Sequence, residues 1–282
     1  MDDQRRLQLR ESFGEQVRKA NEDIDVALAA LEIARIEYPR VAVVKNIQIL
    51  DRYARTLARR LAGSENPFRL VKELNTLLFE EEGFVSNEKD YYDPRNSFLN
   101  DVLERRVGIP VTLSLVYMEV ARRAGFDVEG LGLPGHFIVK IDDKTGPVWV
   151  DPYNRGELLL LEDVRFRLRE ASVKPENMNQ YLEPLTKRQI LARLLTNLKG
   201  IYYNGGQYAK ALAVVEMMLA IYPWSMTEIR DRGMINYQLR SFGAALADLE
   251  TYVTSYPDAP DSDRVKRSIQ MLRPLAERSG VD

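Results

Sequence analysis

The residue best suited to chemistry in this chain is His136, the only histidine among its 282 residues. Asp151 follows in the same stretch of sequence, and a carboxylate that orients an imidazole makes it an effective general base. Ser114 supplies an upstream hydroxyl that such a base could activate as a nucleophile. These residue types together are those of general-base and nucleophilic catalysis.

Composition excludes several other chemistries. The chain contains no cysteine, which excludes thiolate catalysis, disulfides and sulfur-ligated metals. A single histidine also excludes a multi-histidine metal site, and no loop has the spacing of a Mg²⁺ or Ca²⁺ site. We therefore expect neither a metal nor a cofactor.

The charge balance argues against nucleic-acid and membrane partners. Forty Lys and Arg residues and 42 Asp and Glu residues are interspersed, for a net charge of −2, so the basic patch that nucleic-acid binding requires is absent. The N-terminal sequence has no signal-peptide core, and the apolar runs are far shorter than the roughly 20 residues of a membrane span. These features predict a cytoplasmic protein.

His136 and Asp151 are expected on neighbouring strands of a β-hairpin. With a four-residue loop at Asp142–Thr145, a common hairpin length, Ile141 faces Gly146 and His136 lies directly opposite Asp151. Opposed residues on one face have Cβ atoms about 4.5–5.5 Å apart, within hydrogen-bonding reach for these side chains. Alternation separates a core face from a second face that carries the pair. The core face holds Phe137, Val139, Ile141, Val148 and Val150, and the second face holds His136, Ile138, Trp149 and Asp151.

Helical periodicity dominates the chain before the hairpin. Apolar residues recur every three or four positions from Asp23 to Ala34, from Val43 to Leu61 and from Leu70 to Leu78. Residues 1–22 have sparser apolar positions, which indicate a marginal helix or a frayed tail. We interpret residues 1–86 as an N-terminal helical subdomain.

Residues 87–180 are expected to form an α+β core. Pro110 begins a helix there, because the missing N–H of proline costs nothing at the first helical position. This helix is apolar on most sides, which predicts a buried, central position. After the hairpin, Glu157–Leu161 predicts one more strand, followed by a short amphipathic helix.

Polar residues cluster in sequence near the cleft that such a core would form. Each is a candidate for lining the cleft, and each is equally well explained as a helix cap or a turn residue. These residues are Tyr92, Asn96, Asn100 and Asn154.

The remainder of the chain, residues 181–282, contains a repeat. At a spacing of 34 residues, Tyr208, Ala211 and Pro223 recur as Phe242, Ala245 and Pro257. This period resembles that of the tetratricopeptide repeat, a pair of helices that stacks on its neighbours. A last helix around Val265, Ile269, Leu272 and Leu275 is expected to cap the stack. Two interpretations stay open: a groove for a protein partner, or a helical tail that stabilises the preceding domain.

The core sequence resembles the bacterial SirB-type transglutaminase-like proteins. The resemblance is carried by NSFLNDVLERRVGIPVTLSLVYMEVARRAGFDVEG, LPGHF and VDPYN, and it extends from about Leu31 to Pro274. It implies a papain-like transglutaminase core, in which a central helix packs on an antiparallel sheet. In catalytic members, Gly-x-Cys opens that helix. Gly108-Ile109-Pro110 matches this motif with proline in place of the thiol, while His136 and Asp151 match the other two triad members.

Two functions follow from these observations. The first is a degenerate transglutaminase-like domain that binds a protein or peptide, through the repeat helices or the core cleft, and regulates it. The alternative is an amide-bond hydrolase or acyltransferase in which His136 and Asp151 activate water or Ser114. Ser114 lies one helical turn beyond Pro110, roughly 5–6 Å along the axis, and the competing explanation is a buried serine that bonds a backbone carbonyl. The sequence does not determine the oligomeric state.

Overall fold

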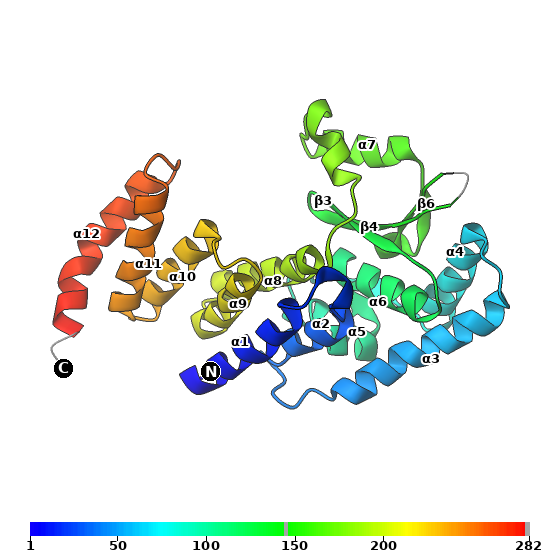
Figure 1. Ribbon diagram of the computed structural model, residues 1–282, viewed down its shortest axis with the longest axis horizontal. Coiled ribbons are helices and arrows are strands. Elements are labelled where there is room, and N and C mark those ends of the chain that lie inside the picture. Colours follow the sequence, from blue (N-terminus) through cyan, green and yellow to red (C-terminus); the bar gives the residue numbers. More distant parts are fainter. Residues whose placement is uncertain (144–145, 280–282) are drawn as a thin grey trace. The chain divides into compact units, whose positions relative to one another are not determined.

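A computed structural model describes residues 1–143 and 146–279 (Figure 1). The chain forms two compact units. One is Asn21–Leu194, and the other joins Met1–Ala20 to the chain from Leu195 onward. The boundary between them falls within helix α8 (Lys187–Asn204). The finer division predicted from the sequence, at residues 86 and 180, stays a prediction.

The first unit begins with helices that follow the predicted periodicity. They are α2 (Val26–Ala34), α3 (Val43–Leu61) and α4 (Pro67–Asn75), after a short 3₁₀ turn η1 (Asn21–Asp23). Asp25 caps α2 by accepting a hydrogen bond from the Leu28 N–H at 2.9 Å, as a short acidic side chain does at a helix start. The helix α4 continues as a π-helical turn, η2 (Thr76–Glu81), which the sequence pattern did not reveal.

Helix α6 (Pro110–Arg123) is the central helix. Every residue from Pro110 to Ala121 is buried, so the prediction of a buried helix that begins at Pro110 is confirmed. Its start is held by Thr112, whose Oγ1 accepts a hydrogen bond from the Ile109 N–H at 3.0 Å. The elements that lead into it are β1 (Val85–Ser86), η3 (Pro94–Asn96), α5 (Leu99–Arg105) and β2 (Val107–Gly108), with β1 and β2 paired in parallel.

Helices cover both faces of an antiparallel sheet (Figure 1). Its strands, in spatial order, are β3 (Glu129–Leu133), β4 (His136–Ile141), β5 (Val148–Asp151) and β6 (Glu157–Leu159). Helix α6 packs against β3 and β4 on one face. On the other face, α7 (Leu161–Glu170) and η5 (Pro175–Tyr181) contribute Val164, Leu168 and Met178 to one apolar cluster with Leu131, Leu133 and Ile138. The second face of the predicted hairpin is therefore also part of a core.

The register of the hairpin differs from the prediction. Ile141 pairs with Val148 and not with Gly146, so the strands are shifted by two positions. Continued along the strands, this register places Asp151 diagonally from His136 instead of directly opposite. The predicted loop included Lys144 and Thr145, which lie outside the described residues. A shift by an even number preserves the faces, because side chains alternate with a period of two.

The second unit contains the repeats. They comprise the C-terminal half of α8, then α9 (Tyr208–Ile221), α10 (Met226–Gln238) and α11 (Phe242–Ser255), with α12 (Ser262–Ser279) packed on α11. Ala211 and Ala245, the small residues of the repeat pattern, are fully buried. The predicted pair of repeats and capping helix is confirmed. Helix α1 (Asp3–Val17) packs on α9 through Leu9, Phe13 and Val17, so this segment is an ordered helix and not a frayed tail.

No helix in the described ranges is both long and apolar enough to cross a membrane.

Candidate functional site

The structure brings His136 and Asp151 into direct contact. His136 is the first residue of β4 and Asp151 the last residue of β5. The imidazole Nε2 and the carboxylate Oδ2 are 2.8 Å apart. The Asp151 side chain is fully buried, whereas the His136 side chain is 19% exposed. When Nε2 donates its proton to the carboxylate, the lone pair of a neutral imidazole is left on Nδ1, the geometry of a general base.

The carboxylate of Asp151 has more partners than the imidazole alone. Its Oδ1 accepts the backbone N–H groups of Tyr153 and Asn154 at 3.1 and 3.3 Å. Its Oδ2 also accepts Asn154 Nδ2 at 2.8 Å and the guanidinium of Arg167 on α7. Burial alone would raise the pKa of Asp151, but the hydrogen bond and charge of His136 and the hydrogen bonds of Arg167 and Asn154 lower it to about 2. The carboxylate is therefore firmly ionised.

This lowered pKa predicts how acid affects the fold. The pKa of Asp151 in the folded chain, about 2, is below its ordinary value of 3.8. Ionised Asp151 therefore stabilises the fold above pH 3.8, and this contribution, about 2 kcal/mol, is lost as the pH falls from about 4 to about 2. Urea unfolding across this range should show wild type losing stability faster than Asp151→Asn. Parallel pH profiles for the two proteins would contradict the prediction.

The hydroxyl groups near the start of α6 bind backbone carbonyls. Ser114 is fully buried, and its Oγ donates to the Phe137 carbonyl at 3.4 Å. Thr112 is also fully buried and donates to the Asn96 carbonyl at 2.8 Å. This geometry favours the structural explanation of Ser114 over its role as a nucleophile. Pro110 itself is buried and has no ionisable group.

The four candidate cleft residues have different surroundings. Asn154 is beside the pair, where its amide binds Asp151. Asn96 is fully buried, and its Nδ2 donates to the Asp90 carbonyl at 2.8 Å, so it fixes a loop. Tyr92 is 75% exposed and stacks edge-on against Tyr91. Asn100 is half-buried on α5, and its Oδ1 has no hydrogen-bond partner among residues 1–143 and 146–279.

Two family models match the chain. Residues 45–196 match a model of the transglutaminase-like superfamily, which covers more than half of the sequence. The chain belongs to the transglutaminase-like superfamily. Residues 198–270 match a tetratricopeptide repeat model, in agreement with the repeats in α9 and α11.

Several bacterial proteins are similar to this transglutaminase-like chain over most of their length. A UPF0162 protein of Xylella fastidiosa (strain Temecula1) is 35% identical over 251 residues, 87% of this chain and 89% of the relative. Protein SirB1 of Salmonella typhimurium is 27% identical over 251 residues, 88% of this chain and 91% of the relative. UPF0162 protein YchA of Escherichia coli (strain K12) is 28% identical over 247 residues, 87% and 90% of the two chains.

Two arginines of the transglutaminase-like unit hold the site and were not singled out from the sequence. Arg167 binds the carboxylate of Asp151. Arg193, on α8, donates to the backbone carbonyls of Leu133 and His136 at 2.8 and 2.7 Å. Arg193 thereby fixes the Pro134-Gly135 turn that precedes the histidine, and burial lowers its pKa. Tyr153 packs edge-on against the imidazole, with ring centroids 5.7 Å apart.

Proposed function

We propose that this chain is a transglutaminase-like protein without transglutaminase chemistry, which acts by binding and regulating a protein partner. One observation carries the proposal. Pro110 occupies the first position of α6, where the resemblance to catalytic members implies a cysteine, and the chain has no thiol elsewhere. A His–Asp pair without a nucleophile cannot form the acyl-enzyme intermediate of that family's reaction.

The surroundings of the pair support this proposal. Asp151 is buried under four different residues that donate hydrogen bonds, and one of them is the cation Arg167. This arrangement holds the two strand ends together, as a structural ion pair does. The tetratricopeptide repeats of the second unit are of a kind that uses concave surfaces to bind other proteins.

One observation favours a second function, hydrolysis without a side-chain nucleophile. The His136 side chain is partly exposed, and its Nε2 is the nitrogen bound to Asp151. The remaining nitrogen, Nδ1, has the lone pair needed to remove a proton from water.

The two functions predict different effects of His136→Ala on the rate of turnover. We expect wild type and His136→Ala to turn over p-nitrophenyl acetate, and to incorporate dansylcadaverine into casein, at the same background rate. The control is Tyr153→Phe, which keeps the ring beside the imidazole, with circular dichroism confirming that each protein is folded. Wild-type turnover above that of folded His136→Ala would overturn the proposal in favour of hydrolysis or acyl transfer.

A further inference from the structure

The transglutaminase-like unit contains a cavity of about 430 Å³ at the end of the sheet away from His136. The cavity is lined by the start of β3, where Glu129 pairs with Lys140, whereas His136 pairs with Leu133 at the other end of β3. Four residues of strand, about 13 Å, separate the two positions. The volume is within the range of about 300–1,000 Å³ typical of ligand sites. The cavity is therefore distinct from the His136–Asp151 site and large enough to bind a ligand.

The walls of this cavity are tied to one another by hydrogen bonds. They come from three segments of the chain, residues 21–26, 115–130 and 184–190. The Leu185 N–H donates to the Gly130 carbonyl at 2.8 Å. The Lys187 N–H donates to Asn21 Oδ1 at 3.0 Å, and the Lys187 ammonium donates to the Glu22 carbonyl at 2.6 Å. The cavity is therefore preformed, so little ordering is needed when a ligand binds.

The floor of the cavity is apolar. Leu115 and Met118 lie about one turn apart on α6, and α8 adds Ile190. Val26 of α2 and Val128, just before β3, complete the floor. All five side chains are buried. An apolar side chain that enters the cavity is therefore removed from water against other apolar groups, which favours binding.

The charged residues that line the cavity are mainly acidic. Their net charge is −2, from four acidic residues and two basic ones: Glu22, Glu119, Asp127, Glu129, Arg122 and Lys187. Both basic side chains already have partners. Arg122 donates to Glu119 at 2.9 Å, and the Lys187 ammonium donates to the Ile24 carbonyl at 2.8 Å as well as to that of Glu22. Neither cation is free to bind a carboxylate of a ligand.

Ion pairs with residues outside the lining leave this charge balance unchanged. Two outside cations pair with lining carboxylates, and each also pairs with a further acidic residue: Arg123 with Asp51 and Lys140 with Asp142. Glu22 and Asp127 are exposed, and within residues 1–143 and 146–279 no cation lies within ion-pair distance of either carboxylate. The unneutralised charge at the rim of the cavity is therefore negative.

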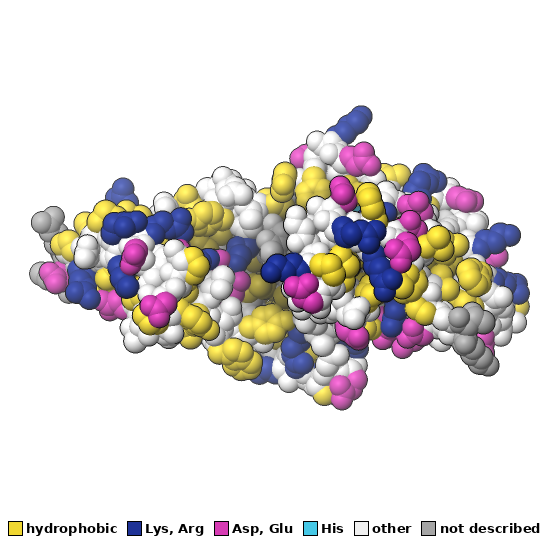
Figure 2. All heavy atoms as spheres, turned by 90° about the horizontal axis from the view of Figure 1, so that it is seen from above, with side chains coloured by type: hydrophobic (Ala, Val, Ile, Leu, Met, Phe, Trp, Pro, Cys, Tyr) yellow, Lys and Arg dark blue, Asp and Glu magenta, His cyan; other side chains and the backbone are white. Residues whose placement is uncertain are grey.

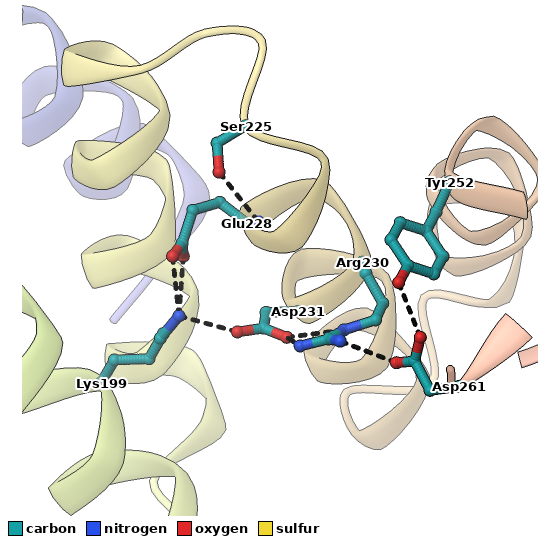
Figure 3. Close-up of polar contacts among 7 residues, drawn as sticks. All are labelled: Lys199, Ser225, Glu228, Arg230, Asp231, Tyr252 and Asp261. Carbon is teal, nitrogen blue, oxygen red and sulfur yellow. Dashed lines mark hydrogen bonds and ion pairs between the residues drawn. The ribbon is translucent and has the colours of Figure 1, made fainter. Parts of the chain in front are cut away.

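The acidic residues of the repeat unit provide a contrast (Figure 3). Lys199 Nζ binds Glu228 at 2.8 Å and Asp231 at 2.7 Å. Arg230 binds Asp231 and Asp261, each at 2.7 Å. Over the face shown in Figure 2, Lys and Arg side chains are likewise interspersed with Asp and Glu side chains. Each carboxylate of the repeat network has a cationic partner and helps to hold the repeats together, whereas the two unpaired carboxylates at the rim of the cavity have no such structural role.

We propose that this cavity binds a basic segment of a protein partner. One apolar side chain of the segment enters the cavity, and flanking Lys or Arg residues pair with Glu22 and Asp127. This inference rests on the proposed function and specifies where on the transglutaminase-like unit the partner binds and what its chemistry is. The charge balance selects the occupant, because an acidic segment would meet two uncompensated carboxylates and a neutral segment would gain nothing from them.

The charge test uses two double variants with the same change in net charge. Glu22→Gln/Asp127→Asn removes the two unpaired carboxylates at the rim. Glu176→Gln/Asp258→Asn is the control, since neither residue lines the cavity. All four side chains are exposed, so circular dichroism should show that both double variants fold like wild type.

The probes are fluorescein-labelled Gly/Ser peptides that contain Lys-Lys-Leu-Lys-Lys, Lys-Lys-Ser-Lys-Lys or Glu-Glu-Leu-Glu-Glu, followed by fluorescence anisotropy with the full-length protein. The basic leucine peptide should bind most tightly. Replacing its leucine with serine should weaken binding by about tenfold, because the apolar anchor is lost. Glu22→Gln/Asp127→Asn should weaken binding of the leucine peptide by about fivefold, whereas the control variant should bind like wild type.

Four results would each overturn the inference: equal binding by the two double variants, equal binding of the two basic peptides, preference for the acidic peptide, or no detectable binding by wild type. Turnover that depends on His136 would instead overturn the proposed function. The two measurements are independent, because none of the peptide-binding results depends on turnover.

Discussion

Replacing Asp151 with asparagine is expected to lower the free energy of unfolding by about 3 kcal/mol, because removal of one member of a buried ion pair leaves the other charge uncompensated. The Asp151 side chain is fully buried, and Arg167, its cationic partner, is only 30% exposed. Asparagine has nearly the same size but directs an N–H₂ group toward donors. The loss is therefore electrostatic and not steric.

The measurement is urea unfolding of the full-length protein at pH 7. Asp142→Asn is the control, because the Asp142 side chain is exposed and Lys140, its partner at 3.2 Å, also pairs with Glu129. Ion pairs with a solvated carboxylate contribute about 0.2–1 kcal/mol. Arg167→Met in the Asp151→Asn background should cost less than the sum of the single changes, because the uncompensated charge is gone. A change within about 0.5 kcal/mol of the control variant would show that the ion pair does not hold the two strand ends together.

The His136–Asp151 contact was predictable from the sequence, although its register was not. Alternating apolar residues determine which face each side chain occupies, and the face is all that the pairing requires. The register also depends on the number of loop residues, and the assumed loop displaced the strands by two positions relative to the observed pairing of Ile141 with Val148. Diagonal side chains on one face remain within reach of each other, so the contact survives the error.

The roles of Arg167 and Arg193 were harder to predict from the sequence than the His136–Asp151 contact. Arg167 is three residues after Val164 and next to Leu168, both fully buried on α7. That position borders the inward face of the helix. An arginine there is usually interpreted as a side chain whose aliphatic part covers the core while its charged group remains in solvent. Its partner, Asp151, is on another element, and no local pattern identifies such a contact. The same limit applies to α1, whose partner α9 lies about 200 positions later in the sequence.

Gly156→Ala is expected to destabilise the first unit by about 3 kcal/mol, from two separate causes. Gly156 has φ +76°, a conformation that L side chains rarely adopt. A β-carbon there would lie 1.9 Å from Asn75 Oδ1, whose amide donates to the Gly156 carbonyl at 2.8 Å. Alanine must therefore strain the backbone and also break this hydrogen bond.

Gly63 separates the two causes. Its φ of +80° is nearly the same, but a β-carbon there meets no atom within 4 Å. Gly63→Ala should cost about 1–2 kcal/mol, from the backbone conformation alone, and urea unfolding of both variants gives the difference. If Gly156→Ala and Gly63→Ala lower the free energy of unfolding equally, the contact with Asn75 does not explain the need for glycine at position 156.

The turn that contains Gly156 also contacts the candidate site. The Gly156 N–H donates to the Asp151 carbonyl at 2.9 Å, and the residues between them supply the N–H groups that bind the Asp151 carboxylate. Displacing Gly156 moves the nearby Asn154, whose side-chain hydrogen bond to the carboxylate lowers the pKa of Asp151. Gly156→Ala should therefore narrow the pH range over which Asp151 stabilises the fold, so that its stability below pH 4 declines less steeply than that of wild type. Gly63→Ala should keep the wild-type profile, since no part of its turn contacts the carboxylate.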